Sequence, residues 1–150
     1  MLTLLLGSPA HSATVLILGD SLSAGYGIDE KNNWVSLLQQ QIEDQHTLVN
    51  GSISGETTAG GLNRLPTLLE LHKPDYVLIE LGGNDGLRGY SIKNMKQNLQ
   101  KIIELSRSKQ AEPLLLAMEI PPNYGSRYTQ AFAEAFPATA RQNSVPLIPF

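Results

Sequence analysis

The chain has 150 residues and a formal net charge of −3, and 41% of its residues are hydrophobic and 17% charged. This composition is that of an ordinary soluble domain with a sizeable core, and it provides no basic surface for binding nucleic acid or an anionic membrane. The sequence contains no cysteine, which excludes disulfides, thiol catalysis and cysteine-ligated zinc.

Residues 1–13 are similar to the second half of a secretory signal peptide. The apolar run Leu2 to Leu6 is followed by small residues up to Ala13, a suitable cleavage site. The run is short and no lysine or arginine precedes it, so we expect a partial signal peptide and a periplasmic or secreted location. The alternative is a cytoplasmic protein. Neither this run nor any other stretch is long enough to span a bilayer, so we expect no stable membrane span.

The first predicted strand leads directly to a candidate nucleophile. Val15 to Leu18 is a continuous apolar run with β-branched residues, typical of a strand buried on both faces of a parallel sheet. The run ends at Gly19, Asp20 and Ser21, which favour a tight turn or a helix start. Because open α/β sheets bind ligands at the carboxyl ends of their strands, Ser21 is placed to act as a nucleophile. The alternative is that Ser21 only caps the helix that follows.

Strands and helices are predicted to alternate along the rest of the chain, which indicates βαβ units and a parallel sheet flanked by helices. Asn32 or Asn33 is expected to cap the first long helix, and Pro66 to kink the next one or delay its start. A final strand with no helix after it would leave one sheet face poorly covered, so we expect the sequence to be a fragment. The predicted helices span 34–45, 62–72, 92–106 and 124–141, and the predicted strands span 47–49, 76–81, 113–118 and 145–148.

Three loops that follow predicted strands carry small polar residues. Because the carboxyl ends of parallel strands meet at one edge of the sheet, these loops are expected to converge. Acyl transfer needs a nucleophile and hydrogen-bond donors aimed at an oxyanion. Ser21 can supply the nucleophile, and the Gly55 N–H and the Asn84 carboxamide can supply donors. Each loop alone is weak evidence, since Gly and Asn are ordinary turn residues. The loops span 19–22, 52–57 and 82–85.

Taken together, GDSL at 19–22, Gly55 in ISGET and GGND at 82–85 resemble the motifs of the SGNH, or GDSL-type, hydrolase family. The flanking segments LILGDSLSAGYG, NGSISGETTAGGLNRLP, ELGGNDGLRG and PPNYGSRYTQAFAEAF are similar to its bacterial thioesterase I/arylesterase/lysophospholipase branch. The resemblance implies one α/β domain over residues 14–150, a three-layer α/β/α sandwich with a five-stranded, mainly parallel sheet. It also implies that Ser21 is the nucleophile and that its N–H forms the oxyanion hole with Gly55 and Asn84.

The resemblance implies a general base that this sequence lacks. In the family the base is a histidine in a C-terminal Asp-x-x-His segment. The histidines present, His11, His46 and His72, are expected on the surface, the last two near the amino edge of the sheet. Asp20 and Asp85 are expected to make hydrogen bonds within their own loops. Without its base a serine hydrolase retains roughly 10³–10⁴-fold catalysis over water. We therefore expect a full-length parent to be a hydrolase and this chain to be inactive or weak.

The predicted substrate is a small-molecule carboxylic ester or thioester, hydrolysed through an acyl-serine intermediate. Leu87, Ile120 and Tyr124 are candidates for the wall of an acyl-chain site, and packing within the domain is an equal alternative. The sequence has no metal-ligand cluster and no phosphate-binding loop. We therefore expect no cofactor, no metal and no nucleic-acid partner, and we expect a monomer. The competing hypothesis is a non-catalytic acyl- or ligand-binding remnant of the same fold; the missing glycine fingerprint disfavours a nucleotide-binding domain.

Overall fold

A parallel β-sheet is the frame of the molecule. The computed structural model describes residues 12–42 and 45–150, so His11 and most of the expected signal peptide lie outside the described residues. Within these ranges the strand order is β2-β1-β3-β4-β5, and every pair is parallel. The strands are β1 (Ala13–Gly19), β2 (His46–Asn50), β3 (Tyr76–Glu80), β4 (Glu112–Leu116) and β5 (Leu147–Ile148).

Strand β1 lies inside the sheet, between β2 and β3, as its apolar run predicts. Leu16, Ile17 and Leu18 are fully buried, and Ile17 pairs with Leu78 of β3. A strand covered on both faces excludes charged side chains along its length, and this explains why the run is continuous rather than alternating.

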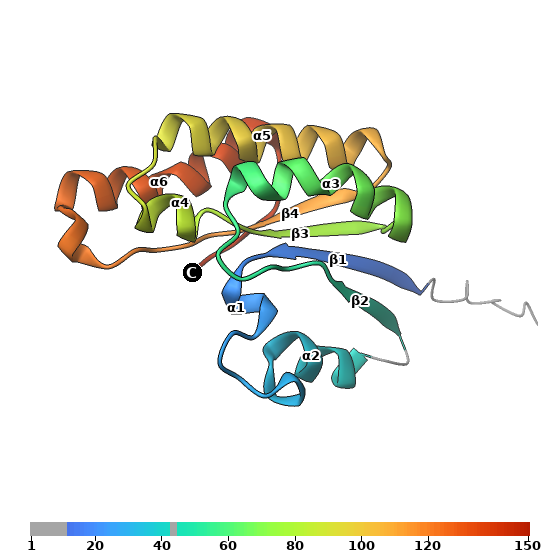
Figure 1. Cartoon of the computed structure of the whole chain (residues 1–150). Coiled ribbons are helices and arrows are strands. Elements are labelled where there is room, and N and C mark those ends of the chain that lie inside the picture. The colour runs from blue at the N-terminus through green and yellow to red at the C-terminus, as the bar shows by residue number, and fades with distance from the viewer. Residues whose placement is uncertain (1–11, 43–44) are drawn as a thin grey trace, which may run out of the picture.

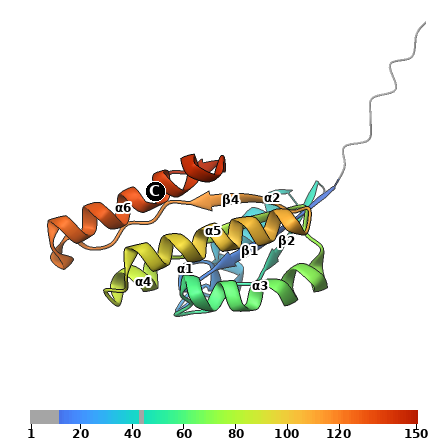
Figure 2. The same cartoon turned by 90° about the horizontal axis from the view of Figure 1, so that it is seen from above.

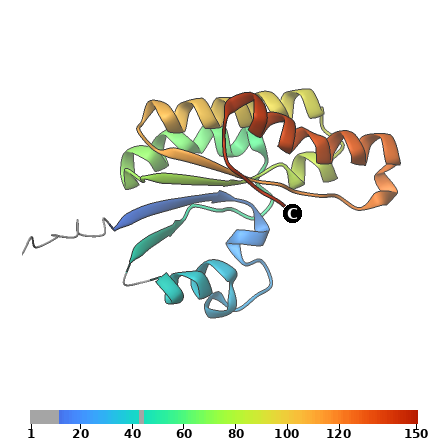
Figure 3. The same ribbon diagram turned by 180° about the vertical axis from the view of Figure 1, so that it is seen from behind.

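Helices cover the two faces of the sheet unequally. In Figure 1, α3 (Thr58–His72), α5 (Ile92–Ser108) and α6 (Ser126–Asn143) lie above the sheet, and α1 (Ser21–Ala24) and α2 (Trp34–Ile42) lie below it. Figure 2 shows the three long helices side by side, and Figure 3 shows the same layers from behind. The expected α/β/α sandwich is confirmed, with a sheet that is parallel throughout the described residues.

The main hydrophobic core lies between the sheet and the three long helices. Phe132 and Phe136 of α6 are fully buried there and meet edge to face, with ring centroids 5.3 Å apart. The helix predicted over 92–106 is confirmed as α5, and four apolar residues at helical spacing along it are buried in this core. These residues are Met95, Leu99, Ile102 and Ile103.

The ends of three helices differ from the sequence prediction or refine it. Asp20, not Ser21, caps α1, since its Oδ1 accepts from the Leu22 N–H at 3.0 Å. Asn33 is the residue that caps α2, where its Oδ1 accepts from the Val35 N–H at 2.8 Å. Helix α3 begins at Thr58, so Pro66 lies inside it and does not delay its start.

Helix α4 (Gly83–Leu87) occupies part of a segment that the sequence predicts as a loop. Glycine is a poor helix former, so propensity gives no signal for this short helix. Its N-cap, Gly82, has a φ of +121°, and a Cβ there would lie 3.0 Å from the Phe136 ring. Glycine is therefore required both by the backbone conformation and by the close packing of this turn against α6.

Candidate active site at the carboxyl edge of the sheet

The turn after β1 presents Ser21 at the carboxyl edge of the sheet. Ser21 is half-buried and is the first residue of α1. The turn passes so close to its neighbours that a Cβ on Gly19 would lie 2.5 Å from Glu80 Oε2 and 2.8 Å from Ser52 Oγ. A residue with a side chain at position 19 would therefore push the turn, and Ser21 with it, out of place.

The carboxamide of Asn84 lies beside the same turn. Asn84 is in the first turn of α4, and its Nδ2 donates a hydrogen bond to Asp20 Oδ2 at 2.9 Å. This contact joins residues that are 64 positions apart in the sequence. The structure thus brings Asn84 next to the residue that precedes Ser21, on the same edge of the sheet.

The loop of residues 51–57 brings Gly55 to this edge. The Ile53 N–H donates to the Gly19 carbonyl at 3.1 Å, and the Arg88 guanidinium donates to the Gly55 carbonyl at 3.0 Å. Gly55 has a φ of +79°, a conformation that favours glycine. The Gly55 loop is therefore attached both to the turn of Ser21 and to the residue that follows α4.

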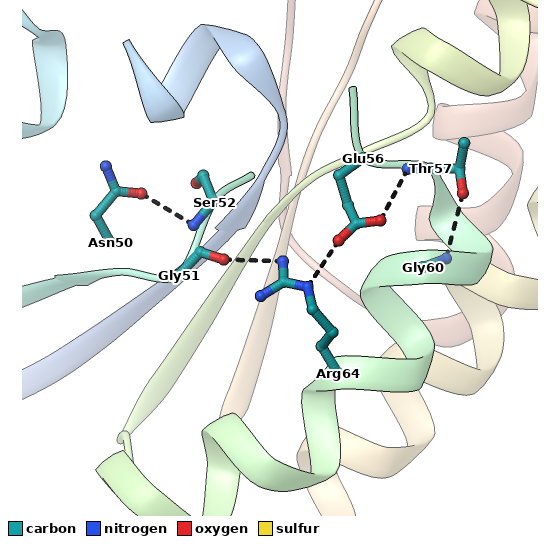
Figure 4. Close-up of polar contacts among 7 residues, drawn as sticks. All are labelled: Asn50, Gly51, Ser52, Glu56, Thr57, Gly60 and Arg64. Carbon is teal, nitrogen blue, oxygen red and sulfur yellow. Dashed lines mark hydrogen bonds and ion pairs between the residues drawn. The ribbon is translucent and has the colours of Figure 1, made fainter. Parts of the chain in front are cut away.

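The Gly55 loop is also braced from behind by α3 (Figure 4). Glu56 Oε2 accepts from Arg64 Nε at 2.7 Å, and Arg64 Nη2 donates to the Gly51 carbonyl at 2.9 Å. Thr57 caps α3 by accepting from the Gly60 N–H at 3.2 Å. This partly buried ion pair holds both ends of the loop against one helix.

Asp85 connects the Asn84 and Gly55 segments, which corrects the expectation that it braces its own loop. Its two carboxylate oxygens accept from the Thr58 N–H at 2.8 Å and from the Thr58 hydroxyl at 2.6 Å. Thr58 is the first residue of α3, directly after the Gly55 loop. The expected local hydrogen bond of Asp20 is confirmed by the Leu22 N–H, and its carboxylate also reaches Asn84.

Hydrogen-bond donors at this edge remain free. Among the described residues, no partner is found for the N–H and the hydroxyl of Ser21, for the Gly55 N–H or for the second N–H of the Asn84 carboxamide. Preorganised donors of this kind stabilise an anion where it develops during a reaction. The arrangement is therefore suited to binding an oxyanion next to a serine hydroxyl.

Two acidic side chains under this turn have altered acidities. Burial, and to a smaller extent the charge of Asp20, raises the pKa of Glu80 to about 7, against the effect of its hydrogen bond from Ser23. Burial also raises the pKa of Asp20, against the effect of its hydrogen bonds to Leu22 and Asn84. Glu80 is not among the residues predicted from the sequence, although a single carboxylate in the apolar run YVLIEL is a usable signal.

Comparison with known proteins decides the family. Residues 17–150 match the model of the GDSL-like lipase/acylhydrolase family. The chain is 48% identical to esterase TesA of Pseudomonas aeruginosa, with 97% of this chain and 74% of that protein covered. It is 47% identical to thioesterase 1/protease 1/lysophospholipase L1 of Escherichia coli K12, with 99% and 72% covered.

The chain belongs to the GDSL/SGNH hydrolase family. The crystal structure of the psychrotrophic esterase EstA from Pseudoalteromonas sp. superposes with a TM-score of 0.90 at 44% identity, and the match covers 93% of this chain and 78% of EstA. The chain therefore spans about three quarters of the length of these relatives.

The histidines that the structure describes lie away from the carboxyl edge of the sheet, where Ser21, Gly55 and Asn84 lie. His46 is the first residue of β2, and its Nδ1 accepts from the Ala13 N–H at 3.2 Å. His72 is the last residue of α3, just before β3 begins. Both positions are at the amino edge of the sheet, as the sequence predicts. No group of three or more side chains able to hold a metal ion occurs in residues 12–42 and 45–150.

Apolar residues at the rim of the site meet one another. The Tyr124 hydroxyl donates to the Leu87 carbonyl at 2.9 Å, and both side chains are exposed, by 38% and 46%. A Cβ on Gly86 would lie 2.9 Å from Ile120 Cγ2, so Ile120 packs directly on α4. The family has acyl substrates, but whether these residues contact one stays a prediction. None of the helices that the structure describes is long and apolar enough to cross a membrane.

Proposed function

We propose that this chain carries the nucleophile and the oxyanion hole of a serine hydrolase that acts on carboxylic esters or thioesters. In the first step the Ser21 oxygen attacks the acyl carbon and its proton passes to a base. The carbonyl oxygen becomes an oxyanion that the Ser21 N–H, the Gly55 N–H and the Asn84 carboxamide stabilise. Collapse of this intermediate expels the alcohol or thiol, and water then hydrolyses the acyl-serine.

The contact between Asn84 and Asp20 is the main support for this proposal. It holds the carboxamide beside the nucleophile turn at 2.9 Å and leaves one N–H free to donate. The activities named for TesA, an esterase, and for the Escherichia coli relative, a thioesterase and lysophospholipase, agree with acyl transfer. We infer from these relatives that the substrate is an acyl compound. They do not favour one among ester, thioester and lysophospholipid.

The residues that the structure describes offer no histidine base for Ser21, and this sets the rate that we expect of them. Neither His46 nor His72 reaches the carboxyl edge, so among the described residues no histidine can accept the Ser21 proton. Serine hydrolases that lose triad members retain roughly 10³–10⁴-fold catalysis over water from the oxyanion hole and substrate binding. We therefore expect slow turnover by these 150 residues, and this weakness keeps a non-catalytic ligand-binding role as the second candidate.

Covalent labelling of Ser21 tests the proposal directly. The chain is incubated with an alkyl fluorophosphonate and analysed by intact mass and peptide mapping; the P–F bond breaks, the Ser21 Oγ–P bond forms, and fluoride and the serine proton leave to solvent. We expect one label, on Ser21, that is absent in Ser21→Ala and unchanged in the control Ser108→Ala, an exposed serine at the end of α5. Equal labelling of wild type and Ser21→Ala would remove Ser21 from the role.

Turnover distinguishes the two candidate functions. We expect p-nitrophenyl butyrate to give a burst of p-nitrophenol followed by slow release, with both phases lost in Ser21→Ala. The non-catalytic alternative predicts binding of the ester without a burst and without labelling.

We also propose that the protein is exported, on the strength of its first 13 residues. N-terminal sequencing of the mature protein tests this, because export with cleavage predicts a first residue near Thr14, and an intact Met1 contradicts it.

A further inference from the structure

The geometry points to Glu80 as a positioning residue whose buried carboxyl group fixes the turn of Ser21 from below. By staying protonated beside Asp20, the same group prevents a second negative charge from lying under the oxyanion donors. This inference rests on the function proposed above for Ser21 and Asn84. It adds a residue that lies outside the family motifs GDSL, Gly55 and GGND, and that touches neither the substrate nor the reacting atoms.

Glu80 is held inside the fold on the nucleophile side of the sheet. It is the last residue of β3 and only 2% exposed. Its Oε2 accepts from the Ser23 hydroxyl at 2.6 Å and from the Asp20 N–H at 3.2 Å, and Ser23 is itself fully buried. These two donors flank Ser21 in the sequence. One oxygen of Glu80 therefore fixes the backbone before Ser21 and the side chain after it.

The same contacts extend to the oxyanion donor Asn84. Asp20, whose N–H is held by Glu80, accepts from the Leu22 N–H with Oδ1 and from Asn84 Nδ2 with Oδ2. A shift of the Asp20 backbone would therefore move the nucleophile and the carboxamide together. Displacements of about 1 Å in catalytic groups can cost about 10²-fold in rate, so the position of this turn matters for catalysis.

The charge of the pair matters as much as its geometry. Asp20 is the titratable group that faces Glu80 among the described residues, and burial, together with the charge of Asp20, favours the protonated form of Glu80. With its pKa at about 7, Glu80 is protonated in weak acid and gains a negative charge beside Asp20 as the pH rises. A second buried anion next to Asp20, the residue that holds Asn84, would destabilise a developing oxyanion.

Replacement of Glu80 by glutamine distinguishes the effect of the negative charge from that of the side chain's size and hydrogen bonds. A glutamine oxygen accepts from Ser23 and from the Asp20 N–H, and its amide N–H₂ donates to the Asp20 carboxylate as a protonated glutamate would. Glu80→Gln therefore copies the protonated state at every pH. Glu80→Ala removes all of these contacts, and Glu112→Gln is the matched control, a glutamate at the exposed amino end of the neighbouring strand β4.

Nuclear magnetic resonance tests the inference without any need for enzymatic activity. We expect the ¹H–¹⁵N signals of the Asp20 N–H and of the Asn84 side-chain amide to titrate with a midpoint near pH 7 in the wild type and in Glu112→Gln. In Glu80→Gln this step should vanish while the signals stay dispersed. A step that persists in Glu80→Gln, or that is missing from the wild type, would overturn the inference even if Ser21 proves to be the nucleophile.

Labelling of Ser21 by the fluorophosphonate gives the second readout. The ratio of the second-order rate constants of wild type and Glu80→Gln cancels every pH effect that both proteins share. We expect a ratio near one at pH 6 and a fall of about tenfold by pH 8.5, with Glu80→Ala about 10–100-fold slower throughout. A constant ratio, with Glu80→Ala labelled as fast as wild type, would refute the positioning role. Absence of Ser21 labelling in every variant would instead refute the proposed function, and the titration would then decide the inference alone.

Discussion

Asp20 is the residue on which the candidate site depends most. Its backbone N–H, its Oδ1 and its Oδ2 each hold a different part of the site: Glu80, the start of α1 and Asn84. Asn84 in turn is oriented by one N–H so that the other is free. A carboxamide that is held in place before the substrate arrives loses no orientational freedom during the reaction, and this is the source of its catalytic value.

Removal of the Asn84 carboxamide should therefore affect reactivity far more than folding. For Asn84→Ala we expect the rate of Ser21 phosphonylation to fall about 10²–10³-fold, the usual loss of about 2.7–4 kcal/mol of transition-state stabilisation for one oxyanion donor. The control is Asn94→Ala, since Asn94 is exposed on α5. A loss of reactivity below threefold, measured with circular dichroism spectra unchanged, would mean that Asn84 is not a donor.

The raised pKa of Glu80 also predicts how stability depends on pH. Its pKa is about 7 in the fold against an ordinary value of 4.5, so between these values the folded state binds more protons than the unfolded state. The free energy of unfolding should consequently fall as the pH rises from about 4.5 to 7 and become constant above, a total loss of about 3 kcal/mol from this group. Glu80→Gln does not titrate and should lack this loss. Urea denaturation at pH 5 and 8 measures it, and parallel changes in both proteins would contradict the assignment.

At the scale of elements, the sequence predicts the strands and helices that carry a regular apolar pattern. The continuous run of β1 and the helical spacing of α5 each carry their own signal over many residues, and both elements form where expected. Helix α4 carries no such signal, because Gly83 and Gly86 are weak helix formers and tertiary packing on Phe136 and Ile120 holds it.

The sequence predicts which residues form the candidate site, but it does not predict the hydrogen bonds that join them. The motifs placed Ser21, Gly55 and Asn84 at one edge because parallel strands place their carboxyl ends there. The hydrogen bonds of Asp20 with Asn84 and of Asp85 with Thr58 join residues 64 and 27 positions apart, and no local pattern encodes such partners. Glu80 gave a weak signal, a carboxylate in an apolar strand, which does not identify what it binds.

The bond between Asp85 and Thr58 makes helices α3 and α4 depend on each other. Asp85→Ala would leave the buried N–H and hydroxyl of Thr58 without their acceptor. Because hydrogen bonds to charged groups contribute about 1.5–3 kcal/mol each, we expect a loss of about 3 kcal/mol in the free energy of unfolding. Glu70→Ala, at an exposed position of α3, should change it by less than about 0.5 kcal/mol. Similar thermal midpoints for both variants would show that the two helices are held by packing alone.

For the whole molecule, the two faces of the sheet contribute unequally to stability. The face under α3, α5 and α6 holds the fully buried residues Phe132 and Phe136, whereas Leu78 and Leu114, which point to the other face, are only half-buried. Phe136 also packs against Gly82, the N-cap of α4. The core on this side therefore supports the element that carries Asn84.

Truncation of one residue on each face should reveal this difference. We expect Phe136→Ala to lower the free energy of unfolding by about 3–5 kcal/mol, the usual cost of removing a fully buried ring. Leu114→Ala removes a side chain that is already partly in contact with solvent, so we expect only about 1–2 kcal/mol. Urea denaturation midpoints with unchanged m-values measure both losses.

Because Gly82 rests on the Phe136 ring, Phe136→Ala should also slow Ser21 phosphonylation in the folded fraction, while Leu114→Ala should leave it unchanged. Equal losses of stability from the two variants would mean that the half-buried face contributes as much as the core.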